Sequence, residues 1–302
     1  MPAPFRDRIV ATLLGSALGD ALGMPVEGLA HQNVRTYYKG IKEPRADEKR
    51  KDLGVGQWTA DTQRARALAR ALATGAPDSP EEVRIAFAAE LASLDLRRPD
   101  IVSPSSAGAA MAAPFGVQAR LRGLKDLASA RWAGLLLKEI DPNPVAHVAT
   151  AAQVAAIRVC LGKDPDGIAG PEILSAALIA ARDAERLLGA DDRVSRRLAD
   201  VSGHLDDFPL DLQDRCGGAD SPADEAFPFA VAMVARSPAL VESTFLSAVN
   251  VGGDAAAVGA CVGAMLGAIH GTEALPQAWL AQLEDADGIR AEAEALADAL
   301  GG

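Results

Sequence analysis

The chain has 302 residues, a net charge of −11 and an isoelectric point near 4.9. A protein this acidic repels the phosphate backbone over most of its surface, which argues against general binding of nucleic acid. Its three cysteines are too few for a disulfide framework, and its four histidines show no ligand spacing, so a zinc hydrolase is disfavoured as well.

The composition predicts an all-α protein. Hydrophobic residues make up 49% of the chain but aromatic residues only 4%, and the excess is alanine and leucine, which favours packed helices over sheets. No run of residues alternates in polarity as a half-buried strand would. Because no Ser/Gly-rich linker divides the sequence, we expect one domain spanning residues 1–302.

The first predicted helix contains the apolar run from Ile9 to Leu18. Arg6 and Arg8 before this run imitate a secretory signal, but Asp20 follows it closely, so we expect a core helix in a cytoplasmic protein. Further along the chain, apolar residues recur at helical spacing within residues 83–94, 173–181 and 229–234. Charged, Pro-containing or Gly-containing segments at 39–52, 95–104, 141–144 and 208–222 read as loops.

Glycines recur every four residues near both ends of the chain, at Gly15, Gly19 and Gly23 and again at Gly259, Gly263, Gly267 and Gly271. This spacing places each set along one stripe of a helix. A glycine costs about 1 kcal/mol in a helix relative to alanine, so the stripes predict two central helices packed backbone to backbone. A membrane hairpin is the rival, but we count fewer than about twenty apolar residues in each stretch, which favours a protein outside the membrane.

Two segments far apart in sequence place carboxylates in apolar surroundings: Trp58-Thr59-Ala60-Asp61-Thr62 and Asn250-Val251-Gly252-Gly253-Asp254. A buried acid is unfavourable unless a cation or a hydrogen-bond donor meets it. Asp61 and Asp254 are therefore candidate ligands of a metal ion, or acids that cap the helices following them. Asp20, on the first helix, is read as a buried acid bonded to neighbouring backbone.

The chain resembles the ADP-ribosylglycohydrolase family of the dinitrogenase-reductase-activating type. Five segments match in the family's order: Gly15 to Glu27, Gly56 to Thr62, Ser105 to Gly116, Ala248 to Gly271, and Pro276 to Leu280. The resemblance implies a single compact helical domain and a pocket for ADP-ribose.

The metal motifs of this family are matched only in part. In its Thr-Asp-Asp-Thr motif, Thr59, Asp61 and Thr62 match, but Ala60 stands at the second position. In its Gly-Gly-Asp-x-Asp-Thr motif, Gly252, Gly253 and Asp254 match, but Ala256 and Ala257 replace the later acid and threonine. Thr59, Asp61 and Asp254 thus remain as metal ligands by resemblance, enough for one magnesium or manganese ion at most, or for none.

The resemblance also implies the substrate side of the site. Glu27 matches a glutamate on that side, although as a residue after Pro25 it is also compatible with an exposed turn. Further candidates for contact with the substrate are Ser106, Gly108 and Met111 in the glycine loop, with Gly252 and Gly253. The basic partner of that loop is replaced by Ala112, and the family's histidine before the middle helices by Asp141.

Three functional hypotheses follow. The first is a protein with a decayed two-metal site that binds free or protein-attached ADP-ribose, or a related nucleotide, and hydrolyses it weakly or not at all. The second is a working hydrolase for an unusual ADP-ribosylated substrate, in which Glu27, Asp61 and Asp254 perform acid–base chemistry with one metal ion or none. The third is a scaffold that binds a partner and has lost the use of the pocket.

Overall fold

The centre of the fold is a pair of helices, α1 (Phe5–Gly23) and α14 (Ala255–His270), that touch through their glycines. A Cβ atom added to Gly19 would lie 1.9 Å from the carbonyl oxygen of Gly259, and one added to Gly263 would lie 1.9 Å from that of Gly15. Only glycine permits so close an approach of two backbones. The predicted backbone-to-backbone packing of the two stripes is confirmed.

The computed structural model describes residues 3–74, 78–98, 100–163 and 167–302, and these form a single compact helical domain. Between residues 24 and 38 lie η1 (Met24–Val26), α2 (His31–Asn33) and η2 (Val34–Tyr38). The other helices are α3 (Ala60–Thr74), α4 (Pro80–Ala92), α5 (Ala107–Ala110), α6 (Ala113–Leu121), α7 (Asp126–Leu136), η3 (Leu137–Glu139), α8 (Pro144–Gly162), α9 (Gly170–Leu188), α10 (Arg193–Ser202), α11 (Pro209–Arg215), α12 (Ala223–Arg236), α13 (Val241–Val249), η5 (Thr272–Ala274), α15 (Gln277–Leu280) and α16 (Ala286–Leu300).

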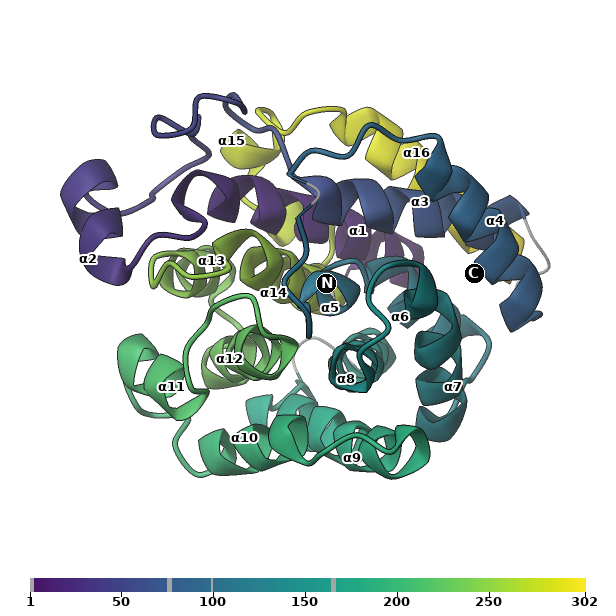
Figure 1. Ribbon diagram of the computed structural model, residues 1–302. Helices are drawn as coiled ribbons and strands as arrows, with labels where there is room; N and C mark the ends of the chain where they lie inside the picture. The colour runs from purple at the N-terminus through teal and green to yellow at the C-terminus, as the bar shows by residue number, and fades with distance from the viewer. Residues whose placement is uncertain (1–2, 75–77, 99, 164–166) are drawn as a thin grey trace.

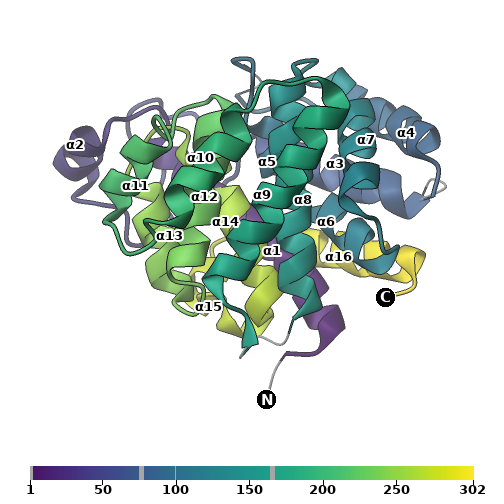
Figure 2. The same ribbon diagram turned by 90° about the horizontal axis from the view of Figure 1, so that it is seen from below.

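The outer helices surround the central pair. In Figure 1, α3, α4 and α16 lie along the upper side and α9 and α10 along the lower side, with α1 and α14 between them. Figure 2 shows α9 and α10 in front of α8, α12 and α14. Within the described residues the backbone forms only two isolated β-bridges, Ala30 with Gly252 and Ser105 with Pro222, so the all-α prediction is confirmed.

Local sequence signals explain where several helices begin and which face they bury. The Asn143 side chain accepts a hydrogen bond from the amide of Val145 at 3.0 Å, and Pro144 opens α8, a favoured combination at a helix N-terminus. On α9 most residues of the apolar pattern are buried, among them Ile173 and Ala177, whereas Leu178 is only partly buried. Gly271 departs from its predicted stripe: it ends α14 at φ 82° and lies beside Ala3 and Asp7.

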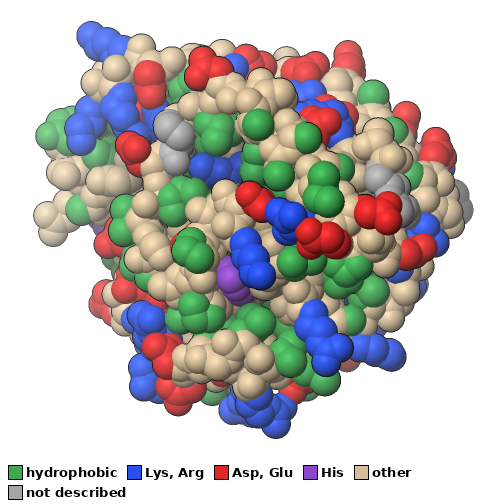
Figure 3. Space-filling view, turned by 45° about the vertical axis from the view of Figure 1, so that its right-hand side comes forward, with side chains coloured by type: hydrophobic (Ala, Val, Ile, Leu, Met, Phe, Trp, Pro, Cys, Tyr) green, Lys and Arg blue, Asp and Glu red, His purple; other side chains and the backbone are tan. Residues whose placement is uncertain are grey.

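Two helices, Phe5–Val26 and Pro144–Gly162, are long and apolar enough to cross a membrane by length and composition. The first is longer than its sequence pattern indicated, because the helical path continues past Asp20. The apolar stretches of the two helices are 100% and 83% buried inside the protein, as the core helices of a globular domain are. On the surface, acidic and basic side chains are interspersed over the face shown in Figure 3.

Candidate functional site

Four chain segments meet beside the junction of α1 and α14 and enclose a cavity of about 50 Å³. The segments are the turn after α1, the start of α3, the loop before α5 and the start of α14. A cavity of this size holds a few water molecules or the tip of a larger ligand. Its lining includes Glu27, Thr59, Ala60, Asp61, Arg64, Arg98, Asp100, Ser105, Ser106, Ser221 and Asp254.

Asp20 holds the start of α3 in place. Its carboxylate accepts hydrogen bonds from the amides of Thr59 and Thr62, both at 3.0 Å, and from the Thr62 hydroxyl at 2.6 Å. Burial raises the pKa of Asp20 to about 7, the negative charge of Asp61 adds to the rise, and the Thr62 and Thr59 donors oppose it. The interpretation of Asp20 as a buried acid bonded to neighbouring backbone is confirmed, because its oxygens accept hydrogen bonds from the amides at the N-terminus of α3.

Replacing Asp20 by alanine should destabilise the protein by about 2 kcal/mol, because three buried donors lose their acceptor while one desolvated carboxyl is removed. The loss should be local. In hydrogen exchange, the amides of Thr59 and Thr62 should exchange faster than in the wild type. Asp7→Ala is the matched control, since Asp7 accepts bonds from the amide and hydroxyl of Thr272 in the same way. Equal exchange at Thr59 and Thr62 in the two variants would contradict the capping role.

Asp61 and Asp254 face the cavity but are held differently. Asp61 Oδ1 lies 3.2 Å from Arg64 Nη1, one turn along α3. Asp254 accepts a hydrogen bond from the Ser106 hydroxyl, and its amide donates to the carbonyl of Ala219 at 2.7 Å. The Asp254 side chain makes no capping hydrogen bond to α14, so that alternative is wrong for Asp254.

The pKa values of these two acids are raised. Burial raises the pKa of Asp254 to about 7, the charge of Asp61 adds to the rise, and the Ser106 hydroxyl opposes it. Burial also raises the pKa of Asp61, against the opposing influence of the Arg64 guanidinium. The charged forms of both acids are thus disfavoured by burial, and that of Asp254 also by the charge of Asp61.

Glu27 is not the exposed turn residue that its place after Pro25 allows. Its Oε2 atom is buried and has no hydrogen-bond partner among the described residues. Burial raises its pKa well above the usual value, with further contributions from Asp254, Asp61 and Asp20, while Arg98 lowers it. This raised pKa favours the protonated form of Glu27, which makes its carboxyl group a candidate proton donor to a ligand in the cavity.

The remaining predicted substrate residues do not line the cavity, apart from Ser106. Gly252 and Gly253 lie against the backbone at Leu29 and Ala219, where added Cβ atoms would come within 1.9 and 2.4 Å of carbonyl oxygens. Gly108 packs against Thr150 on α8, and Met111 is buried. These residues support the walls of the site, and their contact with a substrate stays a prediction.

Several residues near the cavity were missed by the sequence motifs. Arg98 donates to Asp47 at 2.6 Å and to Asp52 at 2.7 Å, which fastens the 39–52 loop beside Glu27. Asp47 is buried, so this loop is not merely the solvated surface that its charges suggest. Asp141 accepts bonds from the Ser103 hydroxyl and the Ser105 amide at 2.8 and 2.6 Å, and so positions the loop carrying Ser106. The sequence of these loops, with charges of both signs, did not indicate which of these residues would form hydrogen bonds or ion pairs.

A two-metal centre of the expected type does not fit these residues. Ala60, Ala256 and Ala257 are buried at the positions where ligands would be needed, and Ala257 packs against Ala110 and Ala260. In the part of the chain that the structure describes, no group of three His, Cys, Asp or Glu side chains is arranged to hold a metal ion. The oxygen donors that remain are those of Thr59, Asp61 and Asp254, with Glu27 nearby.

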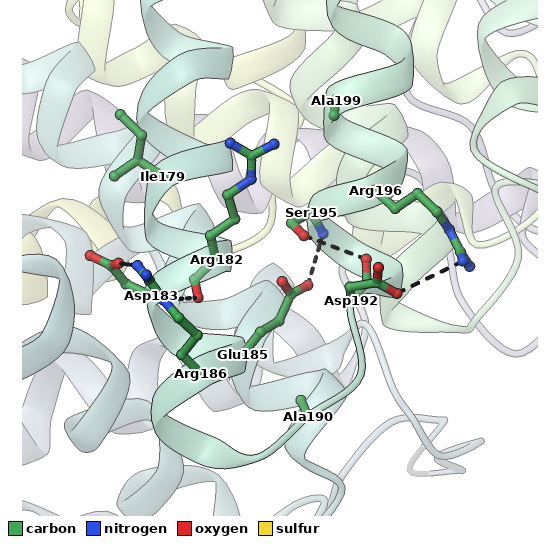
Figure 4. Close-up of a pocket in the computed structure, with 10 residues that line it drawn as sticks. All are labelled: Ile179, Arg182, Asp183, Glu185, Arg186, Ala190, Asp192, Ser195, Arg196 and Ala199. Atoms are coloured by element: carbon green, nitrogen blue, oxygen red, sulfur yellow. Dashed lines mark hydrogen bonds and ion pairs between the residues drawn. The ribbon is translucent and has the colours of Figure 1, made fainter.

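A larger cavity lies elsewhere, in an open groove of about 860 Å³ between α9 and α10 (Figure 4). Each of the three acids in its lining is paired with a near neighbour: Asp183 with Arg186, Asp192 with Arg196, and Glu185 with the Ser195 amide at 2.9 Å. Arg182 lines the groove as well.

Known proteins identify the fold. The sequence model of the ADP-ribosylglycohydrolase family matches residues 1–302. This chain belongs to the ADP-ribosylglycohydrolase family. It is 28% identical to an uncharacterized protein of Archaeoglobus fulgidus, over 90% of both chains, and 24% identical to the uncharacterized protein YegU of Escherichia coli K12, over 92% of both. A solved structure, described as an ADP-ribosylglycohydrolase-related protein complex, superposes with a TM-score of 0.69 at 23% identity over 97% of each chain.

Family membership indicates which cavity is the candidate site. The segments that the resemblance aligned with the ADP-ribosylglycohydrolase motifs, around Asp61, Ser106 and Asp254, are the ones that meet at the cavity. The α9–α10 groove, although larger, lies outside those motifs. The small cavity is therefore the candidate site of this family member.

Proposed function

We propose that this chain binds ADP-ribose, free or attached to a protein, or a related nucleotide, and hydrolyses it slowly or not at all. The observation that supports the proposal most is the meeting of Glu27, Asp61, Ser106 and Asp254 at a cavity flanked by buried alanines where the family places metal ligands. The cavity is too small for a whole nucleotide. A ribose end enters it, and the rest of the ligand lies outside.

The remaining groups suit recognition of sugar hydroxyls. The carboxyl group of Glu27, with its raised pKa, is suited to donate a hydrogen bond, and the oxygens of Asp61, Asp254 and Ser106 can accept hydrogen bonds from the ligand. Efficient hydrolysis of a glycosidic bond needs an oriented water and stabilisation of positive charge on the sugar. The loss of three ligand positions removes the paired metal ions that would hold that water.

Calorimetric titration with ADP-ribose tests this proposal, run in magnesium, in manganese and in chelator, alongside an assay for release of ADP-ribose from a modified protein. Wild-type protein should bind saturably, and Asp254→Ala should weaken binding at least about tenfold, since a lost hydrogen bond to a charged group is worth roughly 1.5–3 kcal/mol. Asp192→Ala, in the α9–α10 groove, should bind as the wild type does. No binding in any buffer would favour the scaffold hypothesis and overturn the proposal.

A second function, slow hydrolysis of an unusual ADP-ribosyl conjugate, is favoured by one observation. The pKa of Glu27, beside Asp61, is raised well above its usual value, and a glycosidase needs one carboxylic acid that donates a proton together with one carboxylate. Glu27 would donate a proton to the leaving group, and Asp61 would orient the attacking water. Turnover of any ADP-ribosyl conjugate that is lost in Glu27→Gln while ADP-ribose still binds would establish this function.

A further inference from the structure

The side chain of Arg64 stands where a cation is needed in the cavity. It is on the second turn of α3, its side chain is 5% exposed, and its guanidinium nitrogen Nη1 lies 3.2 Å from Asp61 Oδ1. Arg64 and Asp61 both line the cavity, as do Glu27 and Asp254. No resemblance or motif assigned a role to Arg64.

We propose that Arg64 replaces the divalent metal of this site, so that the chain binds its ligand without a metal ion. The inference rests on the proposed function for the identity of the ligand, but its metal part can be measured without any ligand. Arginine is suited to this place because its guanidinium is always charged and binds carboxylates through directed hydrogen bonds.

The balance of charge in the cavity supports this assignment. Asp20, Glu27 and Asp254 lie close enough to Asp61 for its negative charge to raise their pKa values, and a divalent ion commonly neutralises such a cluster of acids. Here Arg64 pairs with Asp61, the Ser106 hydroxyl donates to Asp254, and three donors satisfy Asp20. A metal ion at Asp61 would have to lie next to the guanidinium, where like charges repel.

The surrounding residues point in the same direction. Ala60 is buried in the first turn of α3, and Ala257 is closed in by Ala110 and Ala260 on the α14 side. Methyl groups at these places offer no oxygen to complete the shell of a magnesium or manganese ion, which takes about six oxygen ligands. Arg98 is not an equivalent cation, since its guanidinium is fixed from outside by Asp47 and Asp52.

The test is the binding of Mn²⁺ alone, followed by electron paramagnetic resonance, to the wild type, Arg64→Met, Arg64→Lys and Arg98→Met. The wild type should bind no Mn²⁺ at millimolar concentration. Arg64→Met keeps the unbranched apolar part of the side chain but removes its charge, and should bind one equivalent with a Kd at least tenfold below that concentration. Arg64→Lys restores the charge and Arg98→Met leaves Arg64 in place, so both should behave as the wild type. Circular dichroism checks that each variant folds.

One equivalent of Mn²⁺ on the wild type with a submillimolar Kd would overturn the inference, whether or not Arg64→Met folds. Equal Mn²⁺ binding by the wild type and a folded Arg64→Met would overturn it as well. ADP-ribose titration then separates the two proposals. If ADP-ribose fails to bind in every buffer, the proposed function is wrong, whereas the Mn²⁺ results still decide the role of Arg64.

Discussion

Gly19→Ala should destabilise this protein by at least about 3 kcal/mol, or prevent folding altogether. The added Cβ would lie 1.9 Å from the carbonyl oxygen of Gly259 and 2.3 Å from its carbonyl carbon. Because both obstacles are backbone atoms, α1 and α14 would have to separate along their whole contact. Overpacking a core costs about 1–3 kcal/mol when side chains can move, and the gain in helix propensity, about 1 kcal/mol, offsets only part of the larger cost here.

Thermal and denaturant unfolding measure this effect, and Gly203→Ala provides the control. Gly203 follows α10 at φ −90°, and an added Cβ there would meet no atom within 4 Å. That variant should stay within about 0.5 kcal/mol of the wild type. The drop in Tm of Gly19→Ala should be roughly 6 °C or more, at about 2–4 °C per kcal/mol for a chain of this order. Equal stabilities of the two variants would show that α1 and α14 do not pack through their glycines.

Asp254→Asn should stabilise the protein at pH 8 and change it little at pH 4. The pKa of Asp254 is about 7 in the folded protein, against 3.8 in the unfolded chain. Between these values the unfolded chain ionises first and binds fewer protons than the folded one, so the free energy of unfolding falls as pH rises. Below pH 4 both states are protonated and the penalty vanishes. Asparagine does not titrate, and so removes this pH dependence.

The advantage of Asp254→Asn should reach roughly 4 kcal/mol at pH 8, since the pKa is raised from 3.8 to about 7 and each pKa unit corresponds to about 1.4 kcal/mol. Urea unfolding at pH 4, 6 and 8 measures it. Asp206→Asn is the control, because Asp206 is exposed, and its stability should follow that of the wild type at every pH. A variant no more stable than the wild type at pH 8 would mean that Asp254 is ionised and well compensated in the folded protein.

The sequence by itself determined the helical class, the family and the contact between the two glycine stripes. These conclusions were accessible because they depend on local spacing. A residue every four positions marks one face of a helix, and the motifs around Asp61 and Asp254 are short and ordered. The losses at Ala60, Ala256 and Ala257 were equally visible, since a missing oxygen ligand is a property of the residue type alone.

The pairing of the site residues was decided only by the tertiary structure. Asp20 accepts a hydrogen bond from Thr59, 39 residues later in the chain, and Ser106 donates to Asp254 across 148 residues. No local pattern encodes such separations. The spacing of Asp61 and Arg64, three residues apart on a helix, did permit an ion pair. The sequence could not show that this pair is buried at the cavity, because burial depends on how α1, α3 and α14 pack around it. Because of that packing, an ion pair of a kind usually exposed on a helix surface is buried at the cavity of this protein.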